Sequence, residues 1–178
     1  MLTRFVATLG VALPLAMAVP ALAHVTLETP EAQSQHGYKA VLRVGHGCDG
    51  KATRSLRVKI PEGFIAAKPQ PKPGWQVQTV KGPYEKSYEL WGEQVKEGVT
   101  EIVWSGGELP DDFYDEFVFV GRIPDLPEGS QLWFPTVQDC GDGAAHRWIE
   151  IPEPGKSEDD YEQPAPGLKI VHGEASDD

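Results

Sequence analysis

A histidine that follows a cleavage pattern is the feature of this sequence most suited to metal chemistry. Ala21-Leu22-Ala23 matches the small-x-small motif of signal-peptide cleavage, and His24 comes directly after it. Cleavage there gives His24 a free α-amine, whose pKa of about 8 lets it release its proton to a metal far more readily than a lysine. This amine and the imidazole Nδ1 of the same residue can chelate one ion. Two nitrogens completed by carboxylate or water oxygens suit Cu(II), which is at the top of the divalent affinity series.

Residues 1–23 have the organisation of a secretory signal peptide. Arg4 supplies the positive charge, and an apolar stretch follows over residues 5–19. Pro14 interrupts it and Pro20 follows it directly, and it is shorter than the roughly 20 apolar residues that span a bilayer. We therefore expect cleavage at Ala23-His24 and a periplasmic or secreted mature protein without a membrane anchor.

Strand alternation places Glu116 among apolar side chains. In the run Tyr114–Val120, Phe117 and Phe119 share one face, and Glu116 shares the other face with valines. A lone carboxylate there either marks the exposed end of a strand or is kept ionised by a partner such as a metal ion or an arginine. Both interpretations stay open from the residues alone.

A second alternation argument concerns a tryptophan. We expect Ile149 and Ile151 to face the core. Alternation then turns Trp148 and His146 to the opposite face. A tryptophan there can cap a shallow site or pack beneath the acidic segment that follows.

The two cysteines, Cys48 and Cys140, are expected to form a disulfide, because an exported protein folds in an oxidising compartment. They lack the CxxC spacing typical of a thiolate metal site, so we interpret the bond as structural. Both methionines, Met1 and Met17, lie in the predicted signal peptide. The mature chain therefore has no thioether donor, which excludes a thioether-rich Cu(I) site.

The remaining histidines are weaker candidates for metal binding. His36 and His172 lie in polar, turn-like surroundings and are expected to be exposed. His46, close to Cys48, fits a role in a loop. His146 is the one that we keep as a candidate second imidazole.

The charge of the chain argues against nucleic-acid binding. The 178 residues include 16 Lys and Arg against 27 Asp and Glu, a formal net charge of −11. Binding to phosphates needs clustered basic residues, whereas an acidic surface attracts cations. GxSxG, HExxH and phosphate-loop motifs are also absent from the sequence. We therefore expect a binding protein and not an enzyme.

Short β-strands must position these candidate residues. Apolar or alternating runs separated by Gly- and Pro-rich turns occur at 24–27, 38–44, 55–60, 75–80, 88–91, 100–104, 113–123, 131–137 and 147–151. About seven to nine strands in about 130 residues predict an all-β fold, an immunoglobulin-like antiparallel β-sandwich. We expect residues 24–152 to form this domain, and the acidic, proline-broken residues 153–178 to form an extended and partly disordered tail.

Several motifs resemble the YcnI-like domain family, long described as a domain of unknown function. They are His24-Val25-Thr26-Leu27, Ile60-Pro61-Glu62-Gly63, Lys72-Pro73-Gly74-Trp75, Phe113-Tyr114-Asp115-Glu116-Phe117 and Arg147-Trp148-Ile149-Glu150. The resemblance implies an immunoglobulin-like β-sandwich that holds Cu(II) in a single-histidine brace. There the N-terminal histidine supplies amine and ring nitrogens, a strand glutamate supplies oxygens, and a tryptophan lies beside the metal. In this sequence these become His24, Glu116 and Trp148, with Glu28 or Asp115 as alternatives to Glu116.

Three functions are compatible with these features. The first is an exported copper-binding protein acting in copper acquisition, delivery or buffering, with other copper-handling envelope proteins as partners. The second is a copper oxidase or oxygenase resembling the polysaccharide monooxygenases, which needs His146 or His46 as a further nitrogen ligand. The third is a metal-free interaction module of the cell envelope. We favour the first, because one histidine with carboxylate oxygens supports Cu(I) poorly and would cycle slowly between oxidation states.

Overall fold

The structure, a computed structural model, describes residues 24–172. This part of the chain is built from β-strands and one short 3-10 helix, so the all-β prediction is confirmed. The strands are β1 (Thr26–Leu27), β2 (Glu31–Gln33), β3 (Gly37–Val44), β4 (Thr53–Lys59), β5 (Ile65–Pro69), β6 (Gln76–Leu90), β7 (Glu93–Leu109), β8 (Asp115–Arg122), β9 (Gln131–Trp133), β10 (Thr136–Gly141), β11 (Ala144–Trp148) and β12 (Gly167–Val171), and the helix is η1 (Glu158–Asp160).

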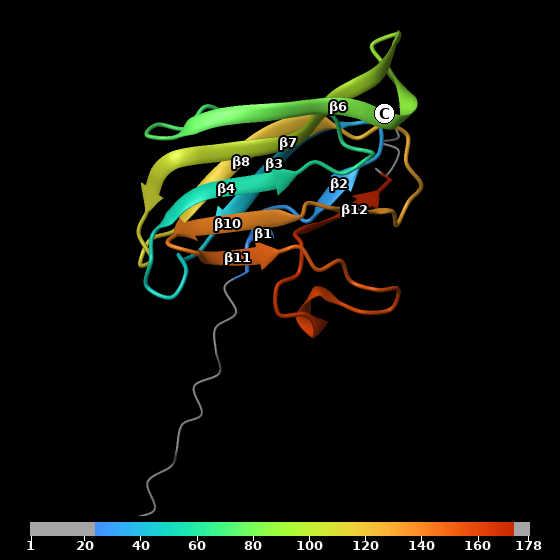
Figure 1. The fold of residues 1–178 in the computed structure, drawn as a ribbon. Coiled ribbons are helices and arrows are strands. Elements are labelled where there is room, and N and C mark those ends of the chain that lie inside the picture. Colours follow the sequence, from blue (N-terminus) through green and yellow to red (C-terminus); the bar gives the residue numbers. More distant parts are fainter. Residues whose placement is uncertain (1–23, 173–178) are drawn as a thin grey trace, which may run out of the picture.

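Two antiparallel sheets contain most of the strands and form two layers (Figure 1). The first sheet has the order β1-β3-β8-β5, and the second has the order β11-β10-β4-β7-β6. In the first sheet, Arg43 of β3 lies opposite Thr26 of β1 on one side and Glu116 of β8 on the other. The site residues expected from the sequence are thus distributed over both sheets.

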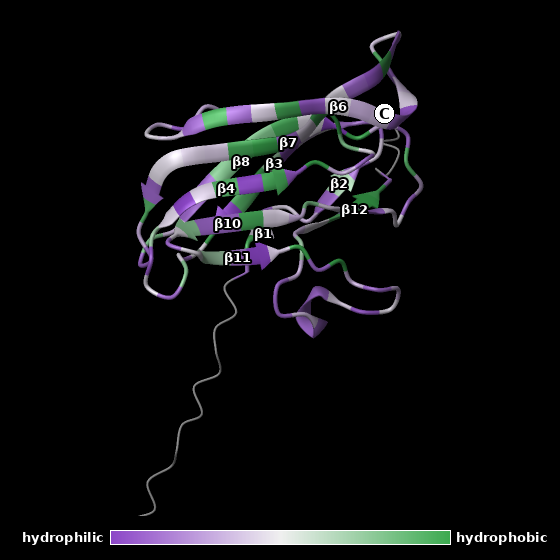
Figure 2. Cartoon of the chain, viewed as in Figure 1, coloured by the Kyte–Doolittle hydropathy of each residue, from purple (hydrophilic) through white to green (hydrophobic). Residues whose placement is uncertain are grey.

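The core between the layers is rich in aromatic rings. Trp104 of β7 contacts Phe117 and Phe119 of β8, with ring centroids 5.6 and 6.4 Å apart, and these side chains are fully buried. Figure 2 shows hydrophobic segments in green on β7 and β12. The predicted alternation in β8, with Phe117 and Phe119 facing inward, is confirmed.

The chain after Pro152 returns to the domain and does not continue as the extended tail that we expected. β12 pairs in parallel with β2 and antiparallel with β9, forming a third sheet. Leu168 and Ile170 of β12 are fully buried, while Lys169 between them is exposed. This alternation of buried and exposed residues is typical of a half-buried strand. The strand is only five residues long and follows an acidic, proline-rich segment. Residues 173–178 lie outside the described residues.

A long hairpin of β6 and β7 differs from the predicted separate runs at 75–80 and 88–91. The register is irregular between Pro83 and Tyr88, and the strand continues past the proline. A proline is tolerated there because β6 is at the edge of its sheet. The turn consists of Trp91 and Gly92, with φ of 53° and 84°. Positive φ at both positions is typical of a type I′ hairpin turn.

Candidate metal centre

His24 lies directly before β1, where the described chain begins (Figure 1). The buried side chains of Val25 and Leu27 anchor this end of the chain, and β1 pairs with β3. The imidazole of His24 lies edge-on to the indole of Trp148, with ring centroids 5.5 Å apart. Its Nε2 is buried and has no hydrogen-bond partner among residues 24–172. Nε2 is thus the buried nitrogen of this ring.

Trp148 is the last residue of β11 and is buried, so the predicted direction of its side chain is wrong. Its Nε1 donates a hydrogen bond to Gln138 Oε1 at 3.1 Å. Ile149 and Ile151, which we expected in the core, are 44% and 53% exposed. The physical reason is that β11 ends at Trp148, so alternation does not extend into the residues that follow. The predicted grouping of Trp148 with His146 is confirmed, since their rings are 5.2 Å apart.

Glu116 lies in a polar group on the outer face of the first sheet. It is opposite Arg43 in the β-register, and its carboxylate accepts a hydrogen bond from the Tyr114 hydroxyl. This hydrogen bond, together with burial, raises the pKa of Tyr114. β3 lies between the strand of Glu116 and β1. The contacts of Glu116 among the described residues are therefore with this polar group and not with His24.

The two alternative carboxylates are also engaged in ion pairs. Glu28 pairs with Arg43 at 2.7 Å, and the hydrogen bond between them is the main cause that raises the pKa of the guanidinium. Asp115 pairs with Lys72 at 2.7 Å. Each carboxylate thus has a cationic partner that already satisfies its charge.

Glu158 is a carboxylate that sequence reasoning missed and whose pKa is influenced by His24. It is half-buried in η1, where the Ser157 N–H donates to the Asp160 carboxylate at 2.9 Å. The pKa of Glu158 is raised, mainly by burial and also by the Asp159 carboxylate, while His24 and a hydrogen bond from the Gly167 N–H lower it in part. The Ser-x-x-Asp pattern could have indicated the turn. Nothing in the sequence indicates which part of the domain the turn approaches.

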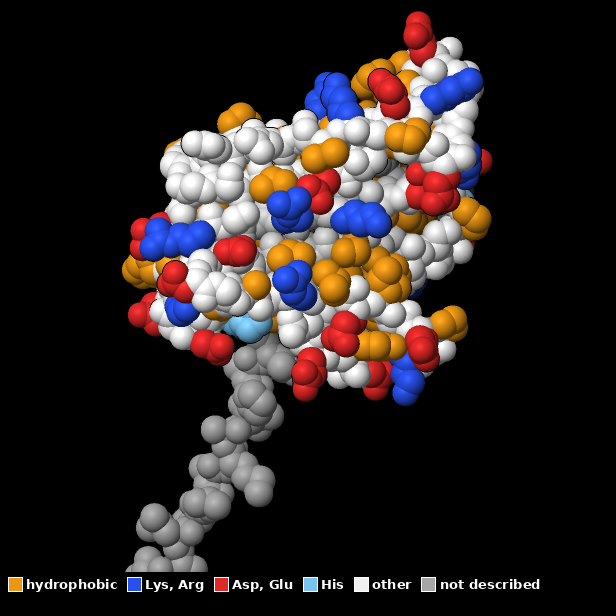
Figure 3. Space-filling model, in the orientation of Figure 1, with side chains coloured by type: hydrophobic (Ala, Val, Ile, Leu, Met, Phe, Trp, Pro, Cys, Tyr) orange, Lys and Arg blue, Asp and Glu red, His pale blue; other side chains and the backbone are white. Residues whose placement is uncertain are grey.

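The other four histidines occupy exposed and half-buried positions. His36 and His172 are exposed, which confirms the prediction, and His46 and His146 are half-buried with ring centroids 5.7 Å apart. Figure 3 shows histidine surface in pale blue near β1 and β11, with acidic side chains in red around it. Residues 24–172 contain no group of three or more His, Cys, Asp or Glu side chains placed to hold a metal ion. A brace at His24 needs fewer side chains, because the α-amine supplies one ligand.

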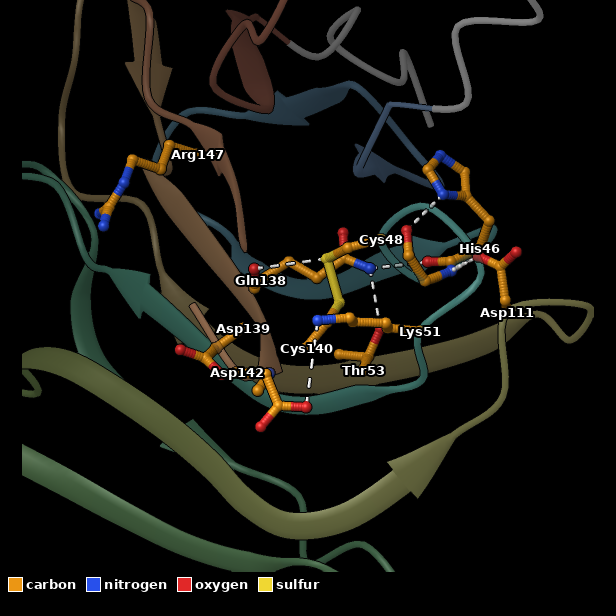
Figure 4. Close-up of a disulfide and its surroundings, with 12 residues drawn as sticks. His46, Cys48, Lys51, Thr53, Asp111, Gln138, Asp139, Cys140, Asp142 and Arg147 are labelled. Carbon is orange, nitrogen blue, oxygen red and sulfur yellow. Dashed lines mark hydrogen bonds and ion pairs between the residues drawn. A yellow bond between two sulfur atoms is a disulfide. The ribbon is translucent and has the colours of Figure 1, made fainter. Parts of the chain in front are cut away.

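Cys48 and Cys140 form the predicted disulfide, which joins the loop before β4 to β10 (Figure 4). Disulfides persist mainly in oxidising compartments, in agreement with export. The predicted signal peptide, residues 1–23, lies outside the described residues. Within residues 24–172, no helix has the length and apolar character to cross a membrane.

Comparisons with known proteins support the fold. A crystal structure of an uncharacterized protein from Nocardia farcinica, reported to reveal an immunoglobulin-like fold, matches with a TM-score of 0.62 and 24% identity, over 85% of this chain and 99% of that chain. The predicted immunoglobulin-like architecture is thereby confirmed. A cohesin module from a Clostridium perfringens family 33 glycoside hydrolase matches with a TM-score of 0.49 and 19% identity, over 84% and 97% of the two chains. No curated protein gives a significant match.

A family model extends the comparison to nearly the whole described chain. It matches residues 24–170, from His24 to the buried Ile170 of β12. Its range therefore contains the segment after Pro152 as well as the sheets before it. The chain belongs to the family described as a domain of unknown function, DUF1775, which is the YcnI-like family that its motifs resemble.

Proposed function

We propose that the mature protein begins at His24 and binds one Cu(II) ion at this end, in the periplasm or outside the cell. Its role is copper acquisition, delivery or buffering, and it is not an enzyme. The observation that supports this most is the position of the His24 ring, which is held against Trp148 with its Nε2 edge buried. The opposite ring nitrogen and the α-amine produced by cleavage then form one chelate.

The residues around His24 fit such an ion. His24 lowers the pKa of Glu158 in part, so we propose Glu158, in place of Glu116, as the source of carboxylate oxygens. Trp148 supplies an apolar wall on one side of the imidazole. The donors would thus be two nitrogens and carboxylate or water oxygens, a set that suits Cu(II).

A binding role agrees with this donor set better than an oxidase or oxygenase does. Cu(II) bound there would be a cargo with accessible coordination positions. The enzymatic alternative needs a second imidazole on the same ion. His146 instead lies against the ring of Trp148, with ring centroids 5.2 Å apart. We therefore propose copper handling without turnover, in exchange with other envelope proteins.

The test is a Cu(II) titration of protein that starts at His24, followed by electron paramagnetic resonance. The comparison protein carries Gly-Ser-Gly-Ser before His24, because one or two added residues would create other amino-terminal copper chelates. We expect tight one-to-one binding with nitrogen couplings in the first protein and its loss in the second. Equal binding by both proteins, or by neither, would contradict the proposal and favour a metal-free interaction module.

Two matched variants identify the carboxylate. Glu158→Gln should weaken Cu(II) binding by roughly tenfold or more, the effect of losing about 1.4 kcal/mol. Glu116→Gln, on the outer face of the first sheet, should leave the affinity unchanged. The reverse result would restore Glu116 as the ligand.

A further inference from the structure

A pair of histidines outside the amino-terminal site has the geometry of a second metal site. His46 lies in the loop between β3 and β4, and His146 lies in β11. Their ring centroids are 5.7 Å apart and their planes are nearly perpendicular, at 85°. With metal–nitrogen bonds of about 2.0–2.1 Å, two imidazoles that share one ion have centroids roughly 5 Å apart at a tetrahedral angle and roughly 6.3 Å apart in a linear arrangement. The separation of this pair lies between these values, so a linear two-coordinate ion requires the rings to move apart by roughly half an ångström.

The loop that carries His46 is fixed from several sides, as Figure 4 shows. The disulfide joins Cys48 to β10, and the Gln138 amide donates to the His46 carbonyl at 2.6 Å. The Gly47 N–H donates to the Asp111 carboxylate at 2.8 Å. A rigid loop lowers the entropy lost when a ligand is bound.

Hydrogen bonding also determines which nitrogen of His46 is available. Its Nδ1 lies 2.5 Å from the Gly47 carbonyl oxygen. A carbonyl oxygen can only accept, so Nδ1 carries the hydrogen and the neutral ring keeps a lone pair on Nε2. Metal-ligating histidines commonly donate their other N–H to a backbone carbonyl in this way.

His146 is positioned by packing on a buried ring. Its imidazole lies 5.2 Å from the indole of Trp148, with the planes tilted by 36°. Trp148 is itself hydrogen-bonded to Gln138, the same side chain that holds the His46 backbone. The buried Gln138 amide therefore helps to position His46, through its backbone carbonyl, and His146, through Trp148.

We propose that His46 and His146 bind a soft monovalent cation, Cu(I), as a two-coordinate pair. Zn(II) and Cu(II) sites are completed by further protein ligands, and residues 24–172 offer no third side chain here. Cu(I) and Ag(I), both d¹⁰ ions, are stable with two nitrogen ligands. Competing soft donors are absent, since the two cysteines are joined to each other and both methionines precede residue 24. This site does not depend on the α-amine and is separate from the Cu(II) site at His24.

The experiment uses Ag(I), which needs no reductant and leaves the disulfide intact. The protein is the one with Gly-Ser-Gly-Ser before His24, in which the amino-terminal chelate is blocked. We expect calorimetry to show one equivalent of Ag(I), and ¹H–¹⁵N NMR to show shifts of the His46 and His146 ring nitrogens in the same titration steps. Fluorescence of Trp148 should fall in parallel, and Trp148→Phe should remove that change.

Matched variants separate the pair from the other histidines. His46→Asn and His146→Asn should each weaken Ag(I) binding at least roughly tenfold, or about 1.4 kcal/mol. His36→Asn and His172→Asn, at exposed positions, should have no effect. Thermal unfolding of all four variants verifies that each is folded.

Three results would contradict the proposed site of His46 and His146. These are the absence of stoichiometric Ag(I) binding, binding that survives both His46→Asn and His146→Asn, and binding that depends on only one of the two histidines. Equally tight Cu(II) binding to the same extended protein would overturn the selectivity for a monovalent ion. The Ag(I) outcomes do not affect the Cu(II) proposal, because the extended protein lacks the amine on which that proposal depends. Tight Cu(II) binding to the extended protein would contradict both proposals.

Discussion

At the scale of single residues, Gln138 holds the candidate region together. It is 1% exposed, and its amide nitrogen donates to the His46 carbonyl at 2.6 Å and to Thr53 Oγ1 at 2.8 Å. Its oxygen accepts from Trp148 Nε1 at 3.1 Å. A buried polar group that loses its partner costs about 1–3 kcal/mol, so this one side chain prevents several such penalties.

We therefore expect Gln138→Leu to lower the free energy of unfolding by about 2–4 kcal/mol, because Thr53 and Trp148 would keep buried polar atoms without partners. Urea unfolding followed by fluorescence measures this loss. The matched control is Gln78→Leu, at an exposed position in β6, which should change stability by less than about 0.5 kcal/mol. Equal losses in the two variants would contradict the role given to Gln138.

Tyr38 should make stability sensitive to alkaline pH. Burial, with a smaller effect of Glu28, raises the pKa of Tyr38 to about 12, and its hydroxyl donates to the Thr29 carbonyl at 2.5 Å. In the unfolded chain a tyrosine titrates near pH 10. Below that pH both states are protonated. As pH rises from about 10 to 12, the unfolded chain releases this proton first, so stability falls.

Tyr38→Phe tests that dependence. Near pH 8 the variant should be less stable than the wild type by about 0.5–1.5 kcal/mol, because it lacks one hydrogen bond. The difference should shrink between pH 10 and 11, where only the wild type loses the contribution of the buried phenol. Urea unfolding of both proteins at each pH measures the difference. A stability difference that stays constant over this pH range would exclude Tyr38 as the origin of the alkaline pH dependence.

At the scale of elements, strand alternation and cysteine content predicted part of the structure. Alternation placed Phe117 and Phe119 in the core, and cysteine content predicted the disulfide. The direction of Trp148 could not be obtained this way, because it depends on where β11 ends. Ile149 and Ile151 are apolar, which favoured the core, but they follow the strand and are exposed. Alternation is informative only within the limits of a strand.

The sequence predicted part of the candidate site, His24 from the cleavage pattern and Trp148 from the family resemblance. His24 follows from the cleavage pattern, and its contact with Trp148 is present in the structure. Glu158, whose pKa His24 influences, lies more than a hundred residues away in the chain. Glu116 was suggested by a strand position that the structure shows to be on the outer face, opposite Arg43. Long-range proximity of this kind has no signature in local sequence.

The disulfide is the strongest link between elements far apart in sequence. Cys48 and Cys140 are separated by 92 positions, and closing a loop of about this length stabilises a protein by about 4–5 kcal/mol in the chain-entropy model. We expect the double variant Cys48→Ala/Cys140→Ala to lose stability of this order in urea unfolding. An unfolding midpoint equal to that of the oxidised wild type would show that the bond does not restrict the unfolded chain as the chain-entropy model assumes.

At the scale of the whole molecule, the last strand completes the domain. β12 inserts between β2 and β9, and also contacts β1, the strand that follows His24. β12, the last strand, therefore contacts β1, the first strand of the described chain. Without β12, the third sheet would lose its central strand, and Ala32 of β2 and Leu132 of β9, both buried, would lose their neighbour.

A chain that ends at Pro152 should consequently fail to fold stably, although the sequence suggested that boundary. It lacks Leu168 and Ile170, whose burial contributes about 1.5–3 kcal/mol each, and it leaves β2 and β9 without backbone partners. That loss approaches the total stability of about 5–15 kcal/mol of a typical domain. Circular dichroism melts of residues 24–152 and 24–172 provide the comparison, and Leu168→Ala in the longer chain should cost about 2–5 kcal/mol. If the shorter chain melted cooperatively at the temperature of the longer one, the domain would be complete without β12. Loss of folding in the shorter chain alone would show that the stability of the amino-terminal site depends on residues near the other end of the sequence.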